Sequence, residues 1–294
     1  MTRIIATIII TLGAAFGLTA QTQPDSLVRK PATQADAYLD LAAKADSLMQ
    51  CEYWAAAADT YRQAMRMQPS NALNPLLMCN MGMCLNEAGD VDGAIATLTD
   101  ARRMLPGSTI AALNRAQVFR GAGLYDEAYA DLSDALDIDS TLVEARLIRG
   151  MLALRSDSID RARADFGILS HMPGDEAHVA AATGNALLYM AVGEYMQAIP
   201  PLSTLVEKFP GDADWLGRRA LCRILTADPA GASEDIAEAM RYAPEDGELY
   251  LYRAMLGKLR YRDEEAKYDR RHAITLGVDA DHADAMIQLV EGRR

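Results

Sequence analysis

The sequence predicts an all-α fold, an α-solenoid of about seven helix-turn-helix repeats followed by a C-terminal capping helix. Three observations predict it. Apolar residues recur at helical spacing in short segments, a small residue returns about every 34 residues, and a proline follows four of the expected second helices. Proline cannot continue a helix, so these prolines mark where hairpins end, at Pro69, Pro106, Pro210 and Pro244.

The clearest copy of the repeat spans residues 109–140, which read as two amphipathic helices joined by a turn at residues 123–125. Its apolar positions lie three or four residues apart, at Leu113, Ala116, Phe119, Ala128, Leu132 and Ala135. A hairpin this small cannot bury its own apolar face. It therefore requires copies of itself on either side.

The copies are found by the small residue in the first turn of each second helix. It recurs at steps of 37, 34, 34, 36, 34 and 34 residues, as Ala57, Ala94, Ala128, Ala162, Ala198, Ala232 and Ala266. A small residue also stands twelve positions earlier, at Ala45, Gly82, Ala116, Gly150, Ala186, Ala220 and Ala254. Four positions after the small residue of each second helix stands an apolar core residue, except in the last copy, where Arg270 stands there.

This pattern resembles the tetratricopeptide repeat family over residues 38–279. The resemblance implies a right-handed superhelix of helix pairs and the usual activity of the family, which is holding another protein. The copies depart from the family pattern at its bulky first-helix residue, which is often Trp. Here that position holds Leu41, Met78, Ala112, Arg146, Ala182, Leu216 and Tyr250, so we expect uneven packing between repeats.

The chain divides in order. We expect residues 1–20 to be a signal peptide and residues 21–36 a flexible leader, followed by seven repeats over 37–279 and a capping helix and tail over 280–294. The repeats span residues 38–71, 75–108, 109–142, 143–176, 179–212, 213–246 and 247–279. We expect residues 175–178 to lengthen the connection before the fifth repeat.

The N-terminus predicts export. A basic start is followed by an apolar run over residues 4–18, too short to span a membrane, and by a cleavage site near Ala20. We expect a periplasmic protein, with extracellular release as the alternative. No further long apolar run follows, so no membrane insertion is expected after cleavage.

The net charge of −12 without a basic stripe argues against nucleic acid as a partner. The sequence neither requires nor excludes a homo-oligomer.

The four cysteines are Cys51, Cys79, Cys84 and Cys222. We interpret these cysteines as buried free thiols that pack as small apolar side chains. An oxidising compartment permits disulfides, and Cys51 with Cys79 or Cys84 is the one bridge to consider.

Four arginines stand just before the small first-helix residue, and each is followed sixteen residues later by an aspartate. The pairs are Arg115 with Asp131, Arg149 with Asp165, Arg219 with Asp235, and Arg253 with Asp269. Where the arginine is absent, the aspartate is absent too. We therefore interpret the pairs as structural ion pairs across each hairpin, with removal of either partner of a buried pair costing roughly 3–5 kcal/mol. The alternative is an arginine ladder for a carboxylate-rich ligand.

No catalytic constellation is found, so no enzyme activity, cofactor or metal is expected. The four histidines, at positions 171, 178, 272 and 282, form no i, i+4 pair and lie beside no cysteine at metal-ligand spacing.

The expected function is binding of a peptide or helix of a partner protein, as a scaffold or adaptor in the cell envelope. The family resemblance places the first helices on a concave groove. Its predicted contact residues are Met83, Leu113, Gln117, Arg120, Leu147, Met151, Leu154, Arg155, Leu187, Met190, Leu221, Leu225, Leu251 and Met255. Methionine adapts to varied shapes, which suits a helix or apolar peptide. An equally weighted alternative is that many of these side chains form the core between repeats.

Three further alternatives concern the occupant and the role. The groove can be filled by the chain's own leader or by a second copy. The chain can instead be a chaperone-like holder of unfolded exported chains, or a glycan-binding component of envelope polysaccharide handling, which would require aromatic platforms. The family's carboxylate clamp is not expected, because its Lys and Asn positions hold Ala42, Cys79 and Leu113.

Overall fold

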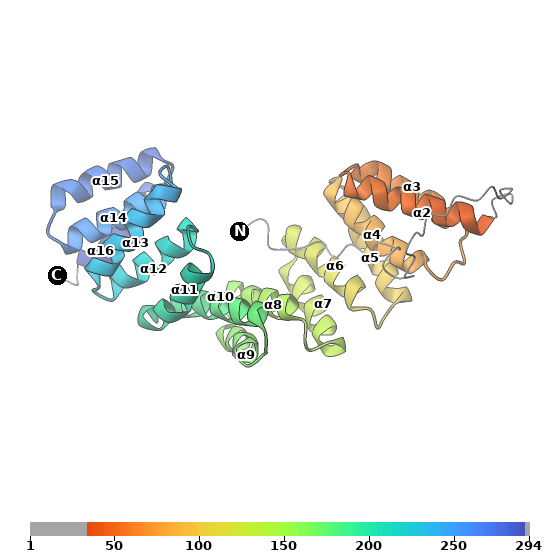
Figure 1. Cartoon of the computed structure of the whole chain (residues 1–294), viewed down its shortest axis with the longest axis horizontal. Helices are drawn as coiled ribbons and strands as arrows, with labels where there is room; N and C mark the ends of the chain where they lie inside the picture. Colours follow the sequence, from red (N-terminus) through yellow and green to blue (C-terminus); the bar gives the residue numbers. More distant parts are fainter. Residues whose placement is uncertain (1–33, 292–294) are drawn as a thin grey trace, which may run out of the picture. The chain divides into compact units, whose positions relative to one another are not determined.

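The computed structural model describes residues 34–291, and these residues form fifteen α-helices and no strand (Figure 1). The helices are α2 (Gln34–Gln50), α3 (Trp54–Met67), α4 (Asn74–Glu87), α5 (Val91–Met104), α6 (Thr109–Gly121), α7 (Tyr125–Ile138), α8 (Val143–Arg155), α9 (Ile159–Leu169), α10 (Asp175–Ala191), α11 (Tyr195–Lys208), α12 (Ala213–Leu225), α13 (Pro229–Tyr242), α14 (Gly247–Leu259), α15 (Asp263–Thr275) and α16 (Ala280–Glu291). The expected signal peptide, most of the leader and the last three residues lie outside this range.

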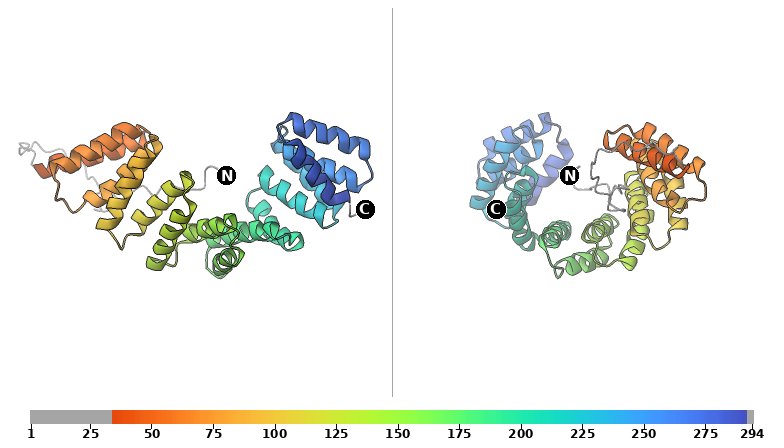
Figure 2. Two further views of the ribbon diagram at one scale, coloured as in Figure 1. Left: turned by 180° about the vertical axis from the view of Figure 1, so that it is seen from behind. Right: turned by 45° about the vertical axis from the view of Figure 1, so that its right-hand side comes forward.

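The helices pack in consecutive pairs, as Figures 1 and 2 show. Each even-numbered helix from α2 to α14 pairs with the helix that follows it, through direct packing or, for α8 and α9, through Arg149 and Asp165. The predicted all-α fold of helix-turn-helix repeats with a terminal helix is therefore confirmed. The described residues divide into two compact units, one ending at Ala145 and one beginning at Arg146.

Two helix starts differ from the sequence expectation. The first helix begins at Gln34, inside the expected leader, and α10 begins at Asp175. Residues 175–178 are therefore the first turn of a helix and not a lengthened connection. Asp175 and Glu176 both lie in that turn, where negative side chains interact favourably with the positive end of the helix dipole.

Every helix pair turns through one residue with positive φ, five positions before the buried alanine of the second helix. These residues are Glu52 (62°), Gly89 (88°), Gly123 (78°), Asp157 (55°), Gly193 (76°), Ala227 (61°) and Tyr261 (58°). Glycine reaches this conformation without strain, whereas a residue with a Cβ atom does not. Four of the seven turns therefore carry backbone strain.

The core of each pair is built where the small first-helix residue meets the bulky second-helix residue. A Cβ atom on Gly82 would lie 2.5 Å from the side chain of Leu98. In the second unit, Phe166 of α9 fills the space left by two glycines, since a Cβ on Gly150 of α8 or on Gly184 of α10 would lie 2.4 or 2.2 Å from its ring. One aromatic ring thus holds α8, α9 and α10 together.

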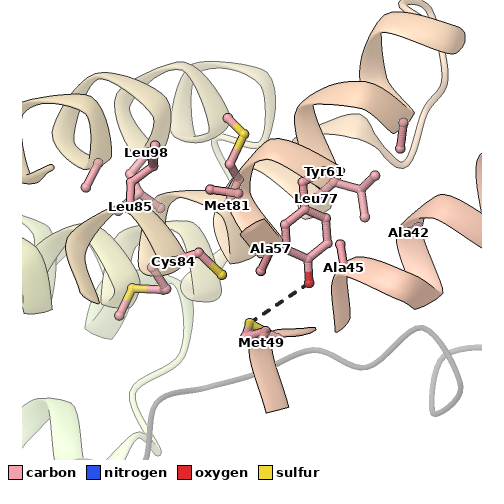
Figure 3. Packing of buried hydrophobic residues seen from close by; sticks show 14 of the residues in the cluster. Ala42, Ala45, Met49, Ala57, Tyr61, Leu77, Met81, Cys84, Leu85 and Leu98 are labelled. Carbon is pink, nitrogen blue, oxygen red and sulfur yellow. Dashed lines mark hydrogen bonds between the residues drawn. The ribbon is translucent and has the colours of Figure 1, made fainter. Parts of the chain in front are cut away.

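The first unit has a polar contact inside its apolar core (Figure 3). Tyr61 of α3 is fully buried among apolar side chains of α2 and α4. Its hydroxyl group donates a hydrogen bond to Asp46 of α2 and lies 3.9 Å from the sulfur of Met49. Asn80 of α4 donates to the same hydroxyl at 3.4 Å, so this contact links the first two helix pairs.

Helix α16 covers the end of the second unit. It packs against α14, α15 and α12, and Ile287 and Val290 join the core cluster of those helices. Arg270 of α15 donates to both oxygens of Asp284 at 2.5 and 2.7 Å, and Lys258 of α14 pairs with Glu291. These contacts explain why Arg270 stands where other repeats have an apolar residue. No helix within residues 34–291 has the length and apolar character needed to cross a membrane.

Candidate functional site

The structure brings each of the four arginines against the aspartate sixteen residues later. In all four pairs the arginine Nε and Nη2 atoms donate to the two oxygens of one carboxylate. The Nε and Nη2 distances are 2.7 and 2.7 Å for Arg115–Asp131, 2.9 and 2.6 Å for Arg149–Asp165, 3.0 and 2.7 Å for Arg219–Asp235, and 2.8 and 2.6 Å for Arg253–Asp269. The aspartates are buried, and each forms a two-point ion pair with its arginine, whose side chain is 13–19% exposed in three pairs and 41% exposed for Arg253.

The arginines also reach beyond their own hairpins. Arg115 of α6 donates to Thr99 of α5 at 3.1 Å, and Arg219 of α12 donates to Ser203 of α11 at 3.2 Å. Each of these two side chains therefore connects three helices. The hydrogen bonds to Asp131 raise the pKa of Arg115, and those to Asp269 raise the pKa of Arg253. This geometry supports a structural role for the four arginines. Their guanidinium groups already bind aspartates, so few donors remain for a carboxylate-rich ligand.

Three of the aspartates have a second arginine that the sequence interpretation missed. Asp131 lies 3.3 Å from Arg102, Asp165 lies 3.5 Å from Arg146, and Asp235 lies 2.8 Å from Arg223. Two of these could have been found by helical spacing. Arg146 lies three residues before Arg149, and Arg223 lies four residues after Arg219, which places each on the same helix face as the paired arginine.

The predicted groove residues fall into two groups. Five of them are buried in the core and cannot present their side chains to a partner, namely Met83, Leu221, Leu225, Leu251 and Met255. The burial of these five side chains favours the alternative that they form core between repeats. Leu251 and Met255 are 0% exposed because they pack in the same cluster as Ile287 and Val290 of α16.

The other nine predicted residues retain exposed surface. In the first unit these are Leu113, Gln117 and Arg120 of α6. In the second unit they are Leu147, Met151, Leu154 and Arg155 of α8, and Leu187 and Met190 of α10. We call the five half-buried apolar members of the second unit, Leu147, Met151, Leu154, Leu187 and Met190, the α8–α10 side chains. Both helices contact Phe166 through their glycines.

Neither tryptophan offers an aromatic platform. Trp215 is 7% exposed and lies 5.7 Å from the guanidinium of Arg218, and Trp54 packs against the core of the first unit. A glycan-binding role therefore lacks the tryptophan platforms it would need. Tyrosines do remain exposed, Tyr261 and Tyr268 among them.

The four cysteines are free thiols, with Cys51 exposed and the other three buried. The bridge considered between Cys51 and Cys79 or Cys84 is absent. Burial raises the pKa of Cys79 to about 11 and the pKa of Cys84 and Cys222 to about 12, so these thiols stay protonated at neutral pH. Within the described residues, no cluster of three His, Cys, Asp or Glu side chains is placed to hold a metal ion.

Known proteins share this repeat and its fold. A family model described as tetratricopeptide repeat matches residues 80–142. Human DnaJ homolog subfamily C member 3 is 27% identical over 183 residues, which cover 58% of this chain and 36% of that protein. The chain therefore matches little more than a third of that relative's length.

Solved structures agree with the fold. A tetratricopeptide repeat protein from Parabacteroides merdae ATCC 43184 superposes with a TM-score of 0.65 at 24% identity, covering 86% of this chain and 98% of that one. YrrB, described as a TPR protein with an unusual peptide-binding site, superposes with a TM-score of 0.50 at 18% identity over 64% of this chain and 97% of its own. The family model places a tetratricopeptide repeat within residues 80–142, and the seven helix pairs of the described residues have the fold of solved tetratricopeptide repeat structures.

Proposed function

We propose that the chain is a scaffold or adaptor that holds an apolar peptide or an amphipathic helix of a partner protein against the α8–α10 side chains. The observation that carries the proposal is the half-buried state of these five apolar residues on the first helices of neighbouring pairs. Half-buried apolar surface gains free energy when a partner removes it from water, by about 25 cal/mol per Å². Two of the five are methionines, which adapt to different partner shapes.

A protein-binding role agrees with the fold, because tetratricopeptide repeat proteins generally act as interaction scaffolds without catalytic activity. YrrB supports the proposal as a protein of this fold with a peptide-binding site. An amphipathic helix suits the α8–α10 side chains, because the apolar face of one bound helix can contact side chains of both α8 and α10.

The experiment is affinity capture from a cell-envelope extract of the source organism, with the chain and two double variants as bait. Met151→Glu with Leu187→Glu places charge among the α8–α10 side chains. Ile168→Glu with Met196→Glu is the matched control, because both residues are exposed on second helices of the same unit. A partner kept by the control and lost by the first variant supports the proposal, provided that the purified partner binds the chain directly.

Other outcomes would change the assignment. A partner caught equally by all three baits would place binding elsewhere on the chain. Many proteins caught weakly would favour a chaperone-like holder of unfolded chains.

We propose further that the protein is exported to the cell envelope, with the periplasm as the first compartment to test. The support is the N-terminal pattern of a basic start, an apolar run over residues 4–18 and a small residue at position 20. Cell fractionation followed by mass spectrometry of the N-terminal peptide tests it. A mature chain that begins at Gln21 is expected, and a chain that retains residues 1–20 in the cytosol would contradict it.

A further inference from the structure

The second unit contains a cavity of about 590 Å³ between α13, α14 and α15. Its wall includes Ser233 of α13, Arg253 of α14, Arg260 directly after α14, and Tyr268 and Asp269 of α15. Tyr268 stands at the rim, since it is 60% exposed. None of the α8–α10 side chains lines this cavity.

Each carboxylate in the wall already has a cation. Asp269 is bound at two points by Arg253. Glu265 lies 3.4 Å from Arg262, and Glu264 lies 2.7 Å from Lys267. The hydrogen bond from Lys267 lowers the pKa of Glu264, so this acid stays ionised and paired. The three acids of the wall are thus neutralised by three cations.

Arg260 is the exception. Within the described part of the chain it forms no ion pair, and its guanidinium contacts only neutral oxygens. Nη2 donates to the backbone carbonyl of Pro229 at 2.5 Å, and Nη1 donates to the hydroxyl of Ser233 at 3.5 Å. Arg260 is half-buried, and a partly desolvated charge without a counter-ion is costly. The wall therefore carries one positive charge that an anion can neutralise.

Further donors border the cavity. Nη1 of Arg253 donates a hydrogen bond to the sulfur of Met240 at 3.5 Å, and sulfur is a weak acceptor. The same guanidinium lies 4.9 Å from the centre of the Tyr250 ring. The ring of Tyr268 stacks on His272 with 6.2 Å between centroids, which holds the tyrosine in place at the rim. These donors therefore favour a ligand with negatively charged oxygen atoms that accept hydrogen bonds.

We propose that this cavity binds a carboxylate of a partner polypeptide, either an Asp or Glu side chain or a C-terminus, with Arg260 as its ionic contact. A carboxylate carries one negative charge, which matches the one unneutralised arginine. A phosphate dianion would exceed it and would face the carboxylates of the wall. The assignment of the carboxylate to a polypeptide rests on the proposed protein-binding role. The residues of the cavity wall differ from the α8–α10 side chains, so either proposal can fail without the other.

The test is a titration of the full-length isotope-labelled chain, followed by NMR. The main probe is an acetylated, amidated alanine pentapeptide with one central glutamate. A second has glutamine in its place, and a third has no glutamate but a free C-terminus. We expect the glutamate or the free-carboxylate peptide to shift backbone signals around Arg260 and Tyr268, and the glutamine peptide to shift none. The two carboxylate peptides distinguish a side chain from a C-terminus.

Two variants and a control complete the test. Arg260→Gln is expected to weaken carboxylate binding by at least about tenfold, the effect of losing one charged hydrogen bond. If Arg260→Gln does not fold, Tyr268→Phe takes its place, because it removes only the hydroxyl group at the rim and should keep the fold. Arg241→Gln is the matched control, since Arg241 is exposed on α13 and lies outside the cavity wall. Equal binding by Arg260→Gln, or by Tyr268→Phe where that is the variant that folds, would overturn the proposal.

Two other results would also overturn it. The first is equal binding of the glutamate and glutamine peptides, or binding of neither carboxylate peptide at millimolar concentration. The second is binding of free glucuronate in this cavity while both carboxylate peptides fail, because that result would assign the site to an acidic saccharide.

Discussion

Arg149 and Asp165 face each other across the α8–α9 hairpin, and two arginine nitrogens contact both carboxylate oxygens at 2.9 and 2.6 Å. The Asp165 side chain is 3% exposed, and Nη1 of Arg146 lies 3.5 Å from the same carboxylate oxygen that Nη2 of Arg149 contacts. The Asp165 carboxylate thus lies within contact distance of two arginines. Such an arrangement fixes how the two helices align and makes the aspartate the more sensitive member of the pair.

Asp165→Ala is expected to lower the free energy of unfolding by roughly 3–5 kcal/mol, because it removes the buried carboxylate that both Arg146 and Arg149 contact. Arg149→Ala is expected to cost less, about 1.5–3 kcal/mol, since Arg146 still contacts the carboxylate. Urea unfolding followed by circular dichroism measures both. Arg163→Ala, at an exposed position on the same helix, is the control and should change little. Costs under about 1 kcal/mol for both variants would show a solvent-screened pair.

The fold could be predicted from the sequence because the repeat is a local signal. Small residues at a step of about 34 residues mark where two helices approach closely, and Gly150 against Phe166 shows why that position must be small. Residues 175–178 were misread because a polar stretch after Gly174 is typical of a loop. The same acidic residues also suit the first turn of a helix.

The candidate site could be predicted only in part. Apolar residues on the inner side of a first helix look alike in sequence whether a partner or another helix covers them. Leu251 and Met255 belong to the same buried cluster as Ile287 and Val290 of α16, while Met151 and Leu187 keep exposed surface. The cavity near Arg260 had no sequence signal, because its wall comes from three helices that meet only in the folded chain.

The turn between α12 and α13 offers a test of backbone strain. Ala227 has a φ of 61°, a conformation that costs a residue with a Cβ atom about 1–2 kcal/mol. Ala227→Gly is expected to stabilise the protein by roughly 0.5–1 kcal/mol, because relief of strain exceeds the added entropy of the unfolded chain. Thermal and urea unfolding measure the change.

The matched control for this turn is Ala237→Gly, an exposed position in the middle of α13. It should destabilise by about 0.5–1 kcal/mol, the ordinary cost of glycine in a helix. If Ala227→Gly lowered stability as much as Ala237→Gly does, the turn would carry no strain.

The buried thiols predict a loss of stability at alkaline pH. Burial raises the pKa of Cys84 and Cys222 from 9.0 to about 12. A folded-state pKa above the unfolded value contributes stability that is complete below pH 9 and is lost as the pH rises towards 12, because only the unfolded state ionises its thiols. Each thiol contributes a slope of at most about 1.4 kcal/mol per pH unit.

Urea unfolding at pH 7, 9, 10 and 11 measures this loss, with Cys222→Ala compared with the parent chain at each pH. The variant should lose less stability than the parent between pH 9 and 11. Identical slopes would show that Cys222 ionises as easily in the folded chain as in the unfolded one. A thiol reagent at pH 8 should label Cys51 alone in the native protein, since only that thiol is exposed.

The contact between Gly150 and Phe166 predicts a compensating pair of substitutions. A Cβ atom at position 150 would lie 2.4 Å from the Phe166 ring, closer than two carbon atoms can approach. The ring has no room to move away, because Gly184 of α10 approaches it from the other helix. Gly150→Ala is therefore expected to cost about 1–3 kcal/mol through overpacking.

Phe166→Leu should recover part of that loss in the Gly150→Ala background, although alone it leaves space beside two glycines and destabilises. The repeat formed by α6 and α7 already uses this combination, with Ala116 in the first helix and Leu132 in the second, both buried. A double-mutant cycle measured by urea unfolding should give a favourable coupling of about 0.5–3 kcal/mol. Strict additivity would mean that the two side chains do not compete for the same space.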